Sequence, residues 1–400
     1  MSEDGPLAGL RVVELASWVM VPAAGGILAA YGADVVKVEP AGSADPSRGS
    51  TIEVDGRRVE SGFELANNRK RSIQLDLGAE AGREVAHRLL AEADVFLTNV
   101  RAKSLARATL APEALAERYP RLIVAHGTGY GTRGDDVDRP SFDELAYWSR
   151  GGIAAALRVE DGPPVGLSGA MGDLPSATAL VAGVMTALYR REREGRGGIV
   201  DVSLFQCGMW ANGWVLQQAL LGASPRARRE RMRGFSPLYN SYVCADGRWV
   251  QFAMLQPARY WRPLCRALGR PELAEDARFA EPAALAAHGP EAIAEVQGTI
   301  ATLDRDALGA RLDAEDLPWS PILEAPEVVR DPQARANGYV RRRPFRGGGE
   351  IETLSPPFHL RGVEPRMGPA PEAGQDTEAV LGELGYDWDE IAALRERGAF

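Results

Sequence analysis

The sequence predicts a two-domain α/β protein whose larger domain is a doubly wound, Rossmann-like parallel sheet. Its 400 residues exceed the usual size of one hydrophobic core, and 45% of them are hydrophobic, which suffices to fill two cores. From residue 10 onward, short apolar runs rich in β-branched residues alternate with segments of helical spacing. Strands that alternate with helices pair in parallel through right-handed crossovers, so this pattern predicts a sheet covered on both faces.

The first three predicted elements form a β-α-β unit. The run "LRVVELA" (10–16) has the length and composition of a buried strand, "VPAAGGILAAYGA" (21–33) has helical spacing, and "DVVKVEP" (34–40) is a second buried strand. The same alternation continues in strands at 71–77, 94–100 and 121–131 and in helices at 80–93 and 111–120.

A long helix and one more strand complete this part of the chain. The helix is predicted from Pro175 to about Arg191, and segment 195–210 predicts a turn, a strand and another helix. The apolar stripe of the long helix consists of Ala177, Leu180, Val181, Val184 and Leu188. We expect this helix to cover one face of the sheet.

A second, smaller domain follows a linker. Residues 222–235 are polar and rich in Gly, Pro and Arg, and residues 238–254 predict a β-hairpin with its turn at Asp246-Gly247. Three helical segments come next. The predicted domains are a large Rossmann-like α/β domain at 1–221, completed by the C-terminal segment 326–400, and a small α+β domain, with its linkers, at 222–325.

Composition excludes several functional classes. The 46 Lys and Arg against 55 Asp and Glu give a net charge of −9, which predicts no nucleic-acid and no membrane partner. The Arg-rich run at 225–233 is expected to be a solvated linker. Three widely spaced cysteines and four isolated histidines predict neither a disulfide framework nor a metal site. With no signal peptide and no membrane span, the protein is expected to be cytoplasmic.

The familiar nucleotide-binding motifs are missing. A dinucleotide fold needs G-x-G-x-x-G after its first strand so that a pyrophosphate can approach the backbone, but this chain has "ASWVMVPAAGG" (16–26) there. Glu39, at the end of the second strand, resembles the acid that holds a ribose, although a strand-end carboxylate is common. A Walker loop and a G-x-S-x-G elbow are absent as well. A nicotinamide-dependent dehydrogenase is therefore disfavoured.

Six segments together resemble the class III CoA-transferases of the CaiB/BaiF type, the family of formyl-CoA transferase, carnitine CoA-transferase and α-methylacyl-CoA racemase. They occur in the family's order over nearly the whole chain, at 6–40, 68–77, 93–100, 129–131, 141–152 and 172–205. The resemblance implies acyl-CoA and a carboxylic acid as substrates, with no tightly bound cofactor. It also implies a ring-shaped protomer threaded through an identical partner, which is an interlocked homodimer.

Asp173 is the candidate catalytic residue. From the residues alone, it is either the cap of the helix that begins near Pro175 or a reactive group. The resemblance implies that it is the nucleophile, which forms an acyl anhydride and then an aspartyl-CoA thioester. Both roles are compatible, because we expect amide donors and the helix dipole at this position to favour the ionised carboxylate.

The resemblance further implies a set of CoA-binding positions. They are Trp18, Val19, Met20, Leu75, Asn99, Val100, Arg107, Arg139, Phe142 and Asp143. For Arg107 an exposed helix position is the alternative, and for Leu75 a place in a core strand is nearly as well supported. Arg48 also matches a family arginine. Residues 17–20 are more apolar than the matching loop of formyl-CoA transferase, which disfavours formate or oxalate as a substrate. Together with Phe142, Tyr147 and Trp148, this loop predicts an apolar acyl pocket.

One departure from the family pattern separates the remaining functions. The racemase branch has a His-Asp pair where this chain has Phe142-Asp143, so the two-base route to racemisation lacks its imidazole. His126 lies earlier, at the end of a strand, and is interpreted as structural rather than as a displaced base. An acyl-CoA racemase or isomerase and a non-catalytic CoA-binding protein are the alternatives to a transferase.

Overall fold

The computed structural model describes residues 5–54, 56–224 and 229–400, and internal contacts divide the chain into two units. These units comprise Met1–Ala156, Pro164–Pro225 and Asn337–Phe400 for the first, and Leu157–Pro163 and Arg226–Ala336 for the second. The contacts extend the second unit to Ala336, beyond the predicted limit at residue 325. Within the Arg-rich run, residues 225–228 lie outside the described part, and Arg231–Arg233 form a single 3-10 turn, η3.

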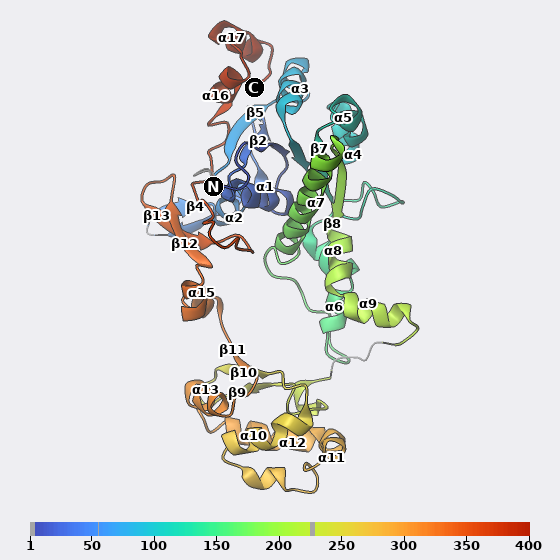
Figure 1. Cartoon of the computed structure of the whole chain (residues 1–400), viewed down its shortest axis with the longest axis vertical. Coiled ribbons are helices and arrows are strands. Elements are labelled where there is room, and N and C mark those ends of the chain that lie inside the picture. The colour runs from blue at the N-terminus through green and yellow to red at the C-terminus, as the bar shows by residue number, and fades with distance from the viewer. Residues whose placement is uncertain (1–4, 55, 225–228) are drawn as a thin grey trace. The chain divides into compact units, whose positions relative to one another are not determined.

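The first unit is built on a six-stranded sheet in which every neighbouring pair is parallel (Figure 1). From one edge to the other its strands are β5 (Arg71–Leu75), β2 (Asp34–Pro40), β1 (Arg11–Leu15), β6 (Val95–Thr98), β7 (Ile123–Thr128) and β8 (Gly198–Ser203). Numbered by their sequence order within this sheet, the strands run 3-2-1-4-5-6. This order confirms the doubly wound sheet and places its topological switch point between β1 and β6.

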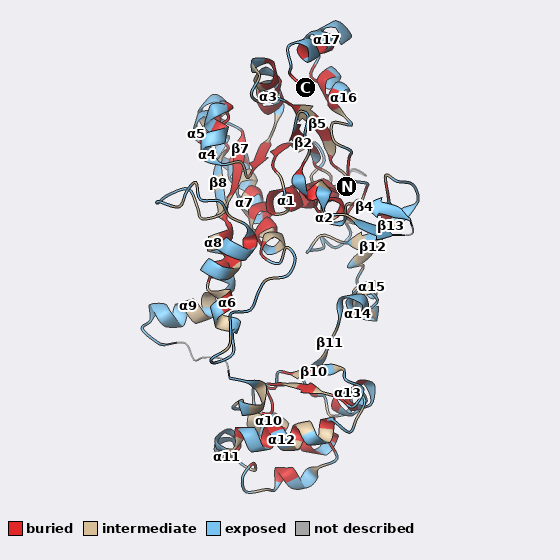
Figure 2. Ribbon diagram, turned by 180° about the vertical axis from the view of Figure 1, so that it is seen from behind, coloured by how far each residue is buried: buried red, intermediate tan, exposed pale blue. Residues whose placement is uncertain are grey.

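Helices cover both faces of the sheet, and each interface is a separate apolar core (Figures 1 and 2). On one face lie α1 (Met20–Ala30) and α7 (Asp173–Glu194). On the other face lie α3 (Glu80–Glu92), α4 (Ala102–Arg107), α5 (Pro112–Arg118), α16 (Thr377–Glu383) and α17 (Trp388–Glu396). Alternate residues of each strand point to opposite cores, as Val12 and Val13 do in β1.

Helix α1 is buried along its whole length, because it lies between the sheet and its neighbours α2 and α7. Helix α7 is amphipathic, and it buries Ala177, Leu180, Val181 and Val184 of the predicted stripe, which confirms that prediction. It ends at Gly195, whose φ of 76° is the left-handed conformation that a glycine adopts without strain.

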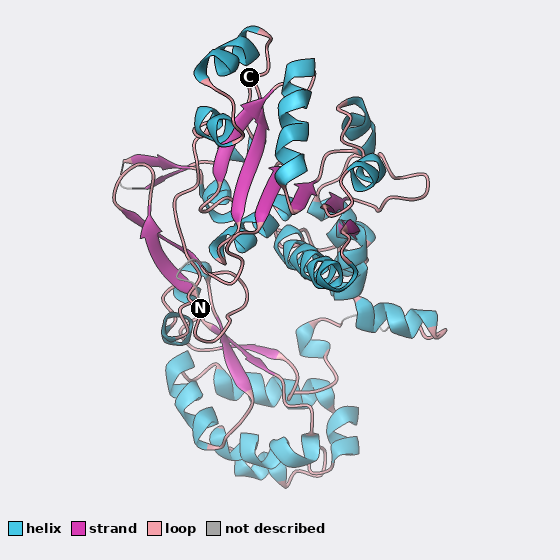
Figure 3. Ribbon diagram, turned by 45° about the horizontal axis from the view of Figure 1, so that its top comes forward, coloured by secondary structure: helices cyan, strands magenta, loops and turns pink. Residues whose placement is uncertain are grey.

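The remaining elements of the first unit are shorter (Figure 3). They comprise the hairpins β3 (Ile52–Val54) with β4 (Arg57–Val59) and β12 (Val340–Pro344) with β13 (Glu350–Leu354), the 3-10 turn η1 (Pro46–Gly49), the π-helix η2 (Glu144–Arg150), and helices α2 (Ser61–Ala66), α6 (Ile153–Leu157), α8 (Leu204–Ala211) and α9 (Gly213–Leu220). Helix α6 ends across the boundary between the two units.

The second unit is an α+β structure with its own apolar core. The predicted hairpin is present as β9 (Ser241–Val243) and β10 (Trp249–Phe252), and β11 (Trp319–Ile322) completes an antiparallel sheet. Its helices are α10 (Pro257–Ala267), α11 (Pro282–Ala287), α12 (Gly289–Ile300), α13 (Arg305–Ala314), α14 (Ala325–Val328) and α15 (Pro332–Ala336), with the 3-10 turn η4 (Pro271–Ala274).

Candidate active site

A cavity of about 570 Å³ opens at the carboxyl ends of strands β1, β6, β7 and β8, within the first unit. This is the edge at which doubly wound sheets bind ligands, and the cavity lies at the switch point between β1 and β6. Seven of the predicted site residues line it, namely Trp18, Met20, Asn99, Val100, Arg139, Phe142 and Asp173. Residues far apart in the sequence are therefore brought together at one cavity.

Asp173 is the first residue of α7 and is half-buried in the cavity wall. The capping alternative is wrong, because Gly172 occupies the N-cap position and no side chain makes a capping hydrogen bond there. Within the described residues, no hydrogen bond or ion pair reaches the Asp173 carboxylate. Burial, and next the nearby negative charge of Asp143, raise the pKa of Asp173 to about 7. The expectation that amide donors favour its ionised form is therefore also wrong.

Asp143 does not line the cavity but holds the turn that carries Asp173. One carboxylate oxygen accepts a hydrogen bond from the Gly172 amide at 3.0 Å, and the other accepts one from the Glu144 amide at 2.9 Å. The second bond caps η2, a π-helix, which is a rare element that is frequent at functional sites. Because Gly172 has no side chain, the Tyr147 ring can approach it; a Cβ there would lie 2.8 Å from that ring.

The two loops at the switch point are bonded to each other. The Ser17 amide donates to Oδ1 of Asn99 at 3.2 Å, and Nδ2 of Asn99 donates to the Ser17 carbonyl at 2.7 Å. Asn99 therefore satisfies both backbone groups of Ser17 with its one side-chain amide. This pairing fixes the floor of the cavity where the sheet reverses its strand order.

Trp18 follows in a left-handed backbone conformation, with φ of 68°. That conformation costs a bulky residue about 1–2 kcal/mol, so the surroundings must hold it. The Trp18 amide donates to Oδ1 of Asp45 at 3.1 Å. Its indole ring meets Phe142 edge to face, with centroids 5.4 Å apart and planes at 89°. Both rings line the cavity and remain about half exposed.

Asp45 belongs to a buried charge network that the sequence did not reveal. Its Oδ2 pairs with Nζ of Lys37 at 2.9 Å, and Lys37 also pairs with Glu14, at 3.1 Å. Glu14 in turn pairs with Lys70 at 2.7 Å, and all four side chains are almost fully buried. Burial lowers the pKa of Lys70 to about 8. Buried charges persist only when paired in this way, so the network fixes the elements that it joins.

The same region bonds Glu39 and Arg48 to each other. Glu39 does not face the cavity but accepts a bidentate pair of hydrogen bonds from Arg48, at 2.7 and 3.0 Å. Arg48 also lies over the Phe63 ring, 3.6 Å from its centroid. Glu39 is thus engaged in the core and is not free to hold a ribose.

The remaining predicted positions lie away from the cavity lining. Leu75 is 1% exposed and packs in the core beneath α3, which matches its core-strand alternative. Val19 packs against the core beneath α1. Arg107 is exposed on α4, which matches the alternative interpretation of this residue as an exposed helix position. Tyr147 is buried under η2, and Trp148 donates its indole N–H to the Val165 carbonyl.

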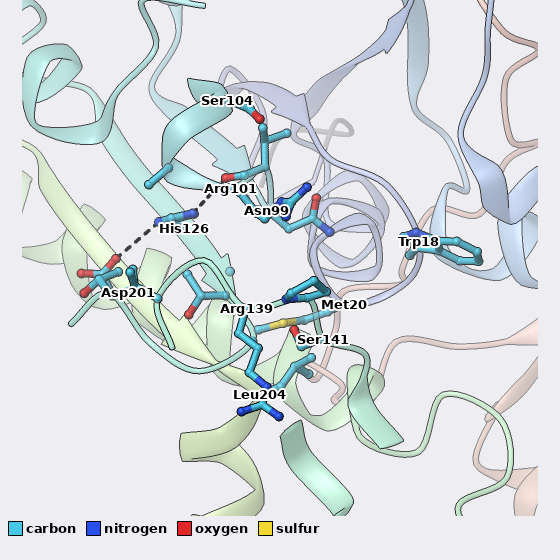
Figure 4. A pocket seen from close by; sticks show the side chains of 18 of the residues that line it. Trp18, Met20, Asn99, Arg101, Ser104, His126, Arg139, Ser141, Asp201 and Leu204 are labelled. Atoms are coloured by element: carbon cyan, nitrogen blue, oxygen red, sulfur yellow. Dashed lines mark hydrogen bonds and ion pairs between the residues drawn. The ribbon is translucent and has the colours of Figure 1, made fainter. Parts of the chain in front are cut away.

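Three further residues line the cavity: Arg101, Asp201 and His126 (Figure 4). The sequence analysis did not single out Arg101 or Asp201, and it interpreted His126 as structural. Strand register aligns Thr98, His126 and Asp201 across β6, β7 and β8, which places His126 beside Asp201. Nε2 of His126 lies 3.2 Å from the Val100 carbonyl and Nδ1 lies 3.8 Å from Oδ1 of Asp201. Burial lowers the pKa of His126. A polar residue at the end of each predicted strand was the available signal.

The cavity combines an acidic and a basic character. Figure 4 shows Asp201 and Trp18 at opposite sides, with Arg139 and Met20 between them. Arg101 makes no ion pair with the described residues, whereas Arg139 pairs with Asp136 at 3.3 Å and is largely exposed.

Among the described residues, no group of three or more His, Cys, Asp or Glu side chains could hold a metal ion. Within the residues that the structure describes, no helix has the length and apolar character needed to cross a membrane.

Comparison with known proteins gives the class of this fold and site. The model of CoA-transferase family III matches residues 7–377. The chain belongs to CoA-transferase family III.

Two curated relatives and one solved structure illustrate this membership. The (R)-2-hydroxy-4-methylpentanoate CoA-transferase of Clostridioides difficile is 32% identical, with 98% of both chains covered. The cinnamoyl-CoA:phenyllactate CoA-transferase of Clostridium sporogenes is also 32% identical, with 97% of this chain and 96% of the relative covered. A CAIB/BAIF family protein from Brucella suis superimposes with a TM-score of 0.85 at 30% identity, over 96% of this chain and 100% of the other.

Proposed function

We propose that this protein transfers CoA from an acyl-CoA thioester to a carboxylic acid, with Asp173 as the nucleophile. The observation that carries the proposal is a carboxylate without a bonding partner in the wall of the switch-point cavity. A carboxylate that serves only the fold would be paired or hydrogen-bonded when half-buried. Membership of a CoA-transferase family supports the same role.

The reaction proceeds by exchanges on one side chain. An oxygen of Asp173 attacks the thioester carbonyl, the C–S bond breaks, and CoA leaves as a thiolate, which leaves a mixed anhydride on Asp173. The thiolate then attacks the aspartyl carbonyl carbon and releases the donor acid as a carboxylate. The acceptor carboxylate attacks the resulting aspartyl-CoA thioester, and the thiolate returns to the acceptor's acyl carbon. Asp173 is regenerated as a carboxylate, and no proton or electron is gained or lost overall.

Two cations of the cavity are suited to the phosphates of CoA. Arg101 lies at the start of α4, and Arg139 lies on the loop before Phe142. A guanidinium binds phosphate through two parallel hydrogen bonds, and Arg101 has no competing ion pair with described residues. We assign Arg101 to this role in place of Arg107, which lies outside the cavity lining.

The acyl group is proposed to be branched or aromatic. Trp18, Met20 and Phe142 present apolar surface to the cavity, which favours apolar groups over formate or oxalate. The names of the two relatives reported above specify (R)-2-hydroxy-4-methylpentanoate for one and cinnamoyl-CoA and phenyllactate for the other, which carry branched or aromatic groups.

CoA exchange tests the proposal directly. Phenylpropanoyl-CoA is incubated with 2-hydroxy-4-methylpentanoate in D₂O, and both CoA esters are followed by mass spectrometry. We expect CoA to move to the hydroxy acid without deuterium entering the donor. In a parallel assay with a chiral 2-methylacyl-CoA as donor, deuterium at the α-carbon without CoA exchange would establish a racemase or isomerase instead. Binding without exchange, for this pair and for a panel of other acyl-CoAs, would establish a CoA-binding protein.

Hydroxylamine trapping locates the nucleophile in the same experiment. Hydroxylamine converts an aspartyl thioester to a hydroxamate, which peptide mass spectrometry should find at residue 173. Asp173→Asn is expected to form no adduct. Asp201→Asn, which removes another carboxylate of the same cavity, should still form it. An adduct at Asp201 instead would overturn the assignment.

The working assembly is proposed to be an interlocked homodimer in the cytoplasm. Helix α9 has no buried residue, and a large apolar surface lies along α8 and α9. Its most exposed members are Trp210, Trp214, Leu220 and Leu221, each more than three-quarters exposed. A contiguous apolar surface of this kind marks a protein interface. The three cysteines are free thiols, which suits a reducing compartment.

A further inference from the structure

The loop that carries Trp18 is fixed by side chains from three different segments. Lys37 donates to the Ala16 carbonyl at 2.7 Å, Asn99 bonds both backbone groups of Ser17, and Asp45 accepts from the Trp18 amide at 3.1 Å. The left-handed conformation of Trp18 is thereby over-determined. Strain held in this manner is frequent at ligand-binding loops, where it aims a particular side chain.

Asp45 is the one member of the buried charge network that bonds Trp18. It is 3% exposed and does not line the cavity. Its Oδ1 accepts three hydrogen bonds, from the Trp18 amide at 3.1 Å, the Ser47 amide at 2.9 Å and the Ser47 hydroxyl at 2.7 Å. Its Oδ2 is held by Lys37. The acceptor for the Trp18 amide is therefore as rigid as the sheet beneath it.

The ring that this conformation directs lines the same cavity as the proposed nucleophile. Trp18 touches Phe142, and Phe142 directly precedes Asp143, whose carboxylate bonds the amide of Gly172. Gly172 is followed by Asp173. The edge-to-face pair of aromatic rings is thus connected to the nucleophile through one hydrogen bond and two peptide links.

We propose that Asp45 is a positioning residue that sets the acyl selectivity of this site, by holding Trp18 left-handed so that its indole and Phe142 form an aromatic wall. The group selected is flat or branched and apolar. This proposal rests on the proposed CoA-transferase function. Without the bond to Asp45, the Trp18 backbone relaxes to a negative φ, and the ring leaves Phe142.

The selectivity ratio is the quantity to measure. It is kcat/KM for phenylpropanoyl-CoA divided by kcat/KM for propionyl-CoA, with one acceptor acid throughout. Trp18→Gly keeps the left-handed backbone without strain and removes the ring, so we expect the ratio to fall about tenfold or more. Trp388→Gly removes an exposed tryptophan of α17 and should leave the ratio unchanged.

Substitutions of Asp45 test the positioning role. Asp45→Ala removes the acceptor, and the ratio is expected to fall as in Trp18→Gly. Asp45→Asn retains an amide oxygen for the three donors at Oδ1, so it should keep the ratio within about twofold of the wild type, even if Lys37 loses its charge partner. This variant also serves if Asp45→Ala does not fold. A fall in Asp45→Asn equal to that of Trp18→Gly would overturn the proposal.

A double-mutant cycle separates positioning from a general effect on the fold. In the Trp18→Gly background, Asp45→Ala should produce no further change in the ratio, because its effect passes through the missing ring. Additive changes would contradict the proposal. A wild-type protein that exchanges CoA with no donor would refute the proposed function, whereas exchange with an unaltered ratio in Trp18→Gly would refute only this inference.

Discussion

A carboxylate that acts as a nucleophile must be ionised and must have no hydrogen bond or ion pair that occupies its oxygens. Asp173 satisfies the second condition, since no described group bonds it, but the same lack of donors raises its pKa to about 7. The half-buried position therefore leaves the carboxylate without bonding partners but disfavours its ionised form. A pKa of about 7 predicts that part of the protein carries a protonated Asp173 near neutral pH.

This titration predicts the pH dependence of the reaction. Because only the ionised carboxylate attacks, kcat/KM should rise with pH and level off above an inflection near pH 7. Asp143→Asn removes the neighbouring negative charge, which lowers the pKa of Asp173 and should move the inflection to lower pH. Steady-state rates from pH 5 to pH 9 check both statements. An inflection that stays in place in Asp143→Asn would show that the charge of Asp143 does not act on Asp173.

Asp173→Asn should abolish CoA transfer and stabilise the folded protein. We expect kcat to fall by at least about 10³-fold, because an amide cannot form the anhydride. The folded-state pKa of Asp173 lies above the ordinary value of 3.8, so its contribution to stability is present below pH 3.8 and is lost as pH rises towards 7. The thermal unfolding midpoint of the variant should therefore be higher than that of the wild type between pH 5 and pH 8. A gain that shrinks over this range would contradict the assigned pKa direction.

The residues alone left Asp173 either as a helix cap or as a reactive group, and only the resemblance to a family singled it out as the nucleophile. The sequence also pointed to Arg107 rather than Arg101, which lines the cavity, because packing decides which side of α4 faces the cavity. The sequence analysis also overlooked Asp45, whose role depends on the left-handed backbone of Trp18, and no local pattern predicts that conformation. The row of Thr98, His126 and Asp201 follows from strand register, which a single sequence leaves open.

At the scale of elements, the turn that precedes α7 is closely packed against the start of η2. A Cβ on Gly172 would lie 2.8 Å from Cβ of Asp143 and from the Tyr147 ring. Gly172→Ala is expected to destabilise the protein by about 1–3 kcal/mol through overpacking. It should also lower kcat, since the turn carries Asp173.

Denaturant unfolding and initial rates measure these two effects. Gly62→Ala in α2 is the matched control, because a Cβ there meets nothing within 4 Å and alanine favours a helix. This control should be at least as stable as the wild type. Equal stability of both variants would show that the turn can shift without strain.

Elements with strong periodicity were predicted within a few residues. The helix expected from Pro175 begins at Asp173 because its first turn is set by the bond between Gly172 and Asp143, which lies far away in the sequence. The π-helix η2 was not predicted, since "ELAYWSR" has ordinary helical composition. Its widened turns are imposed by close packing against α8, where a Cβ on Gly208 would lie 2.1 Å from the Tyr147 carbonyl oxygen.

At the scale of the whole molecule, the exposed tryptophans of α8 and α9 predict self-association. Wild-type protein should have a solution mass of twice the 43.0 kDa of one chain. A Trp210→Glu, Trp214→Glu double variant places charge on this apolar surface and should shift the mass towards one chain or towards disordered aggregates. Light scattering after size-exclusion chromatography distinguishes these states. A variant that remains fully dimeric would place the interface elsewhere.

The first unit is discontinuous, and this affects how it is made. Residues between 380 and 399 supply Val380, Leu381, Leu384, Ile391, Leu394 and Ala399 to the core on the α3 face. The carbonyl of Ala399 also accepts a hydrogen bond from the amide of Asp76 at 2.8 Å. A ribosome that has released the first 225 residues has thus delivered a sheet with one apolar side incompletely covered, and it must translate the entire second unit before the missing cover emerges. During that interval the uncovered apolar surface makes the nascent polypeptide prone to association with other chains.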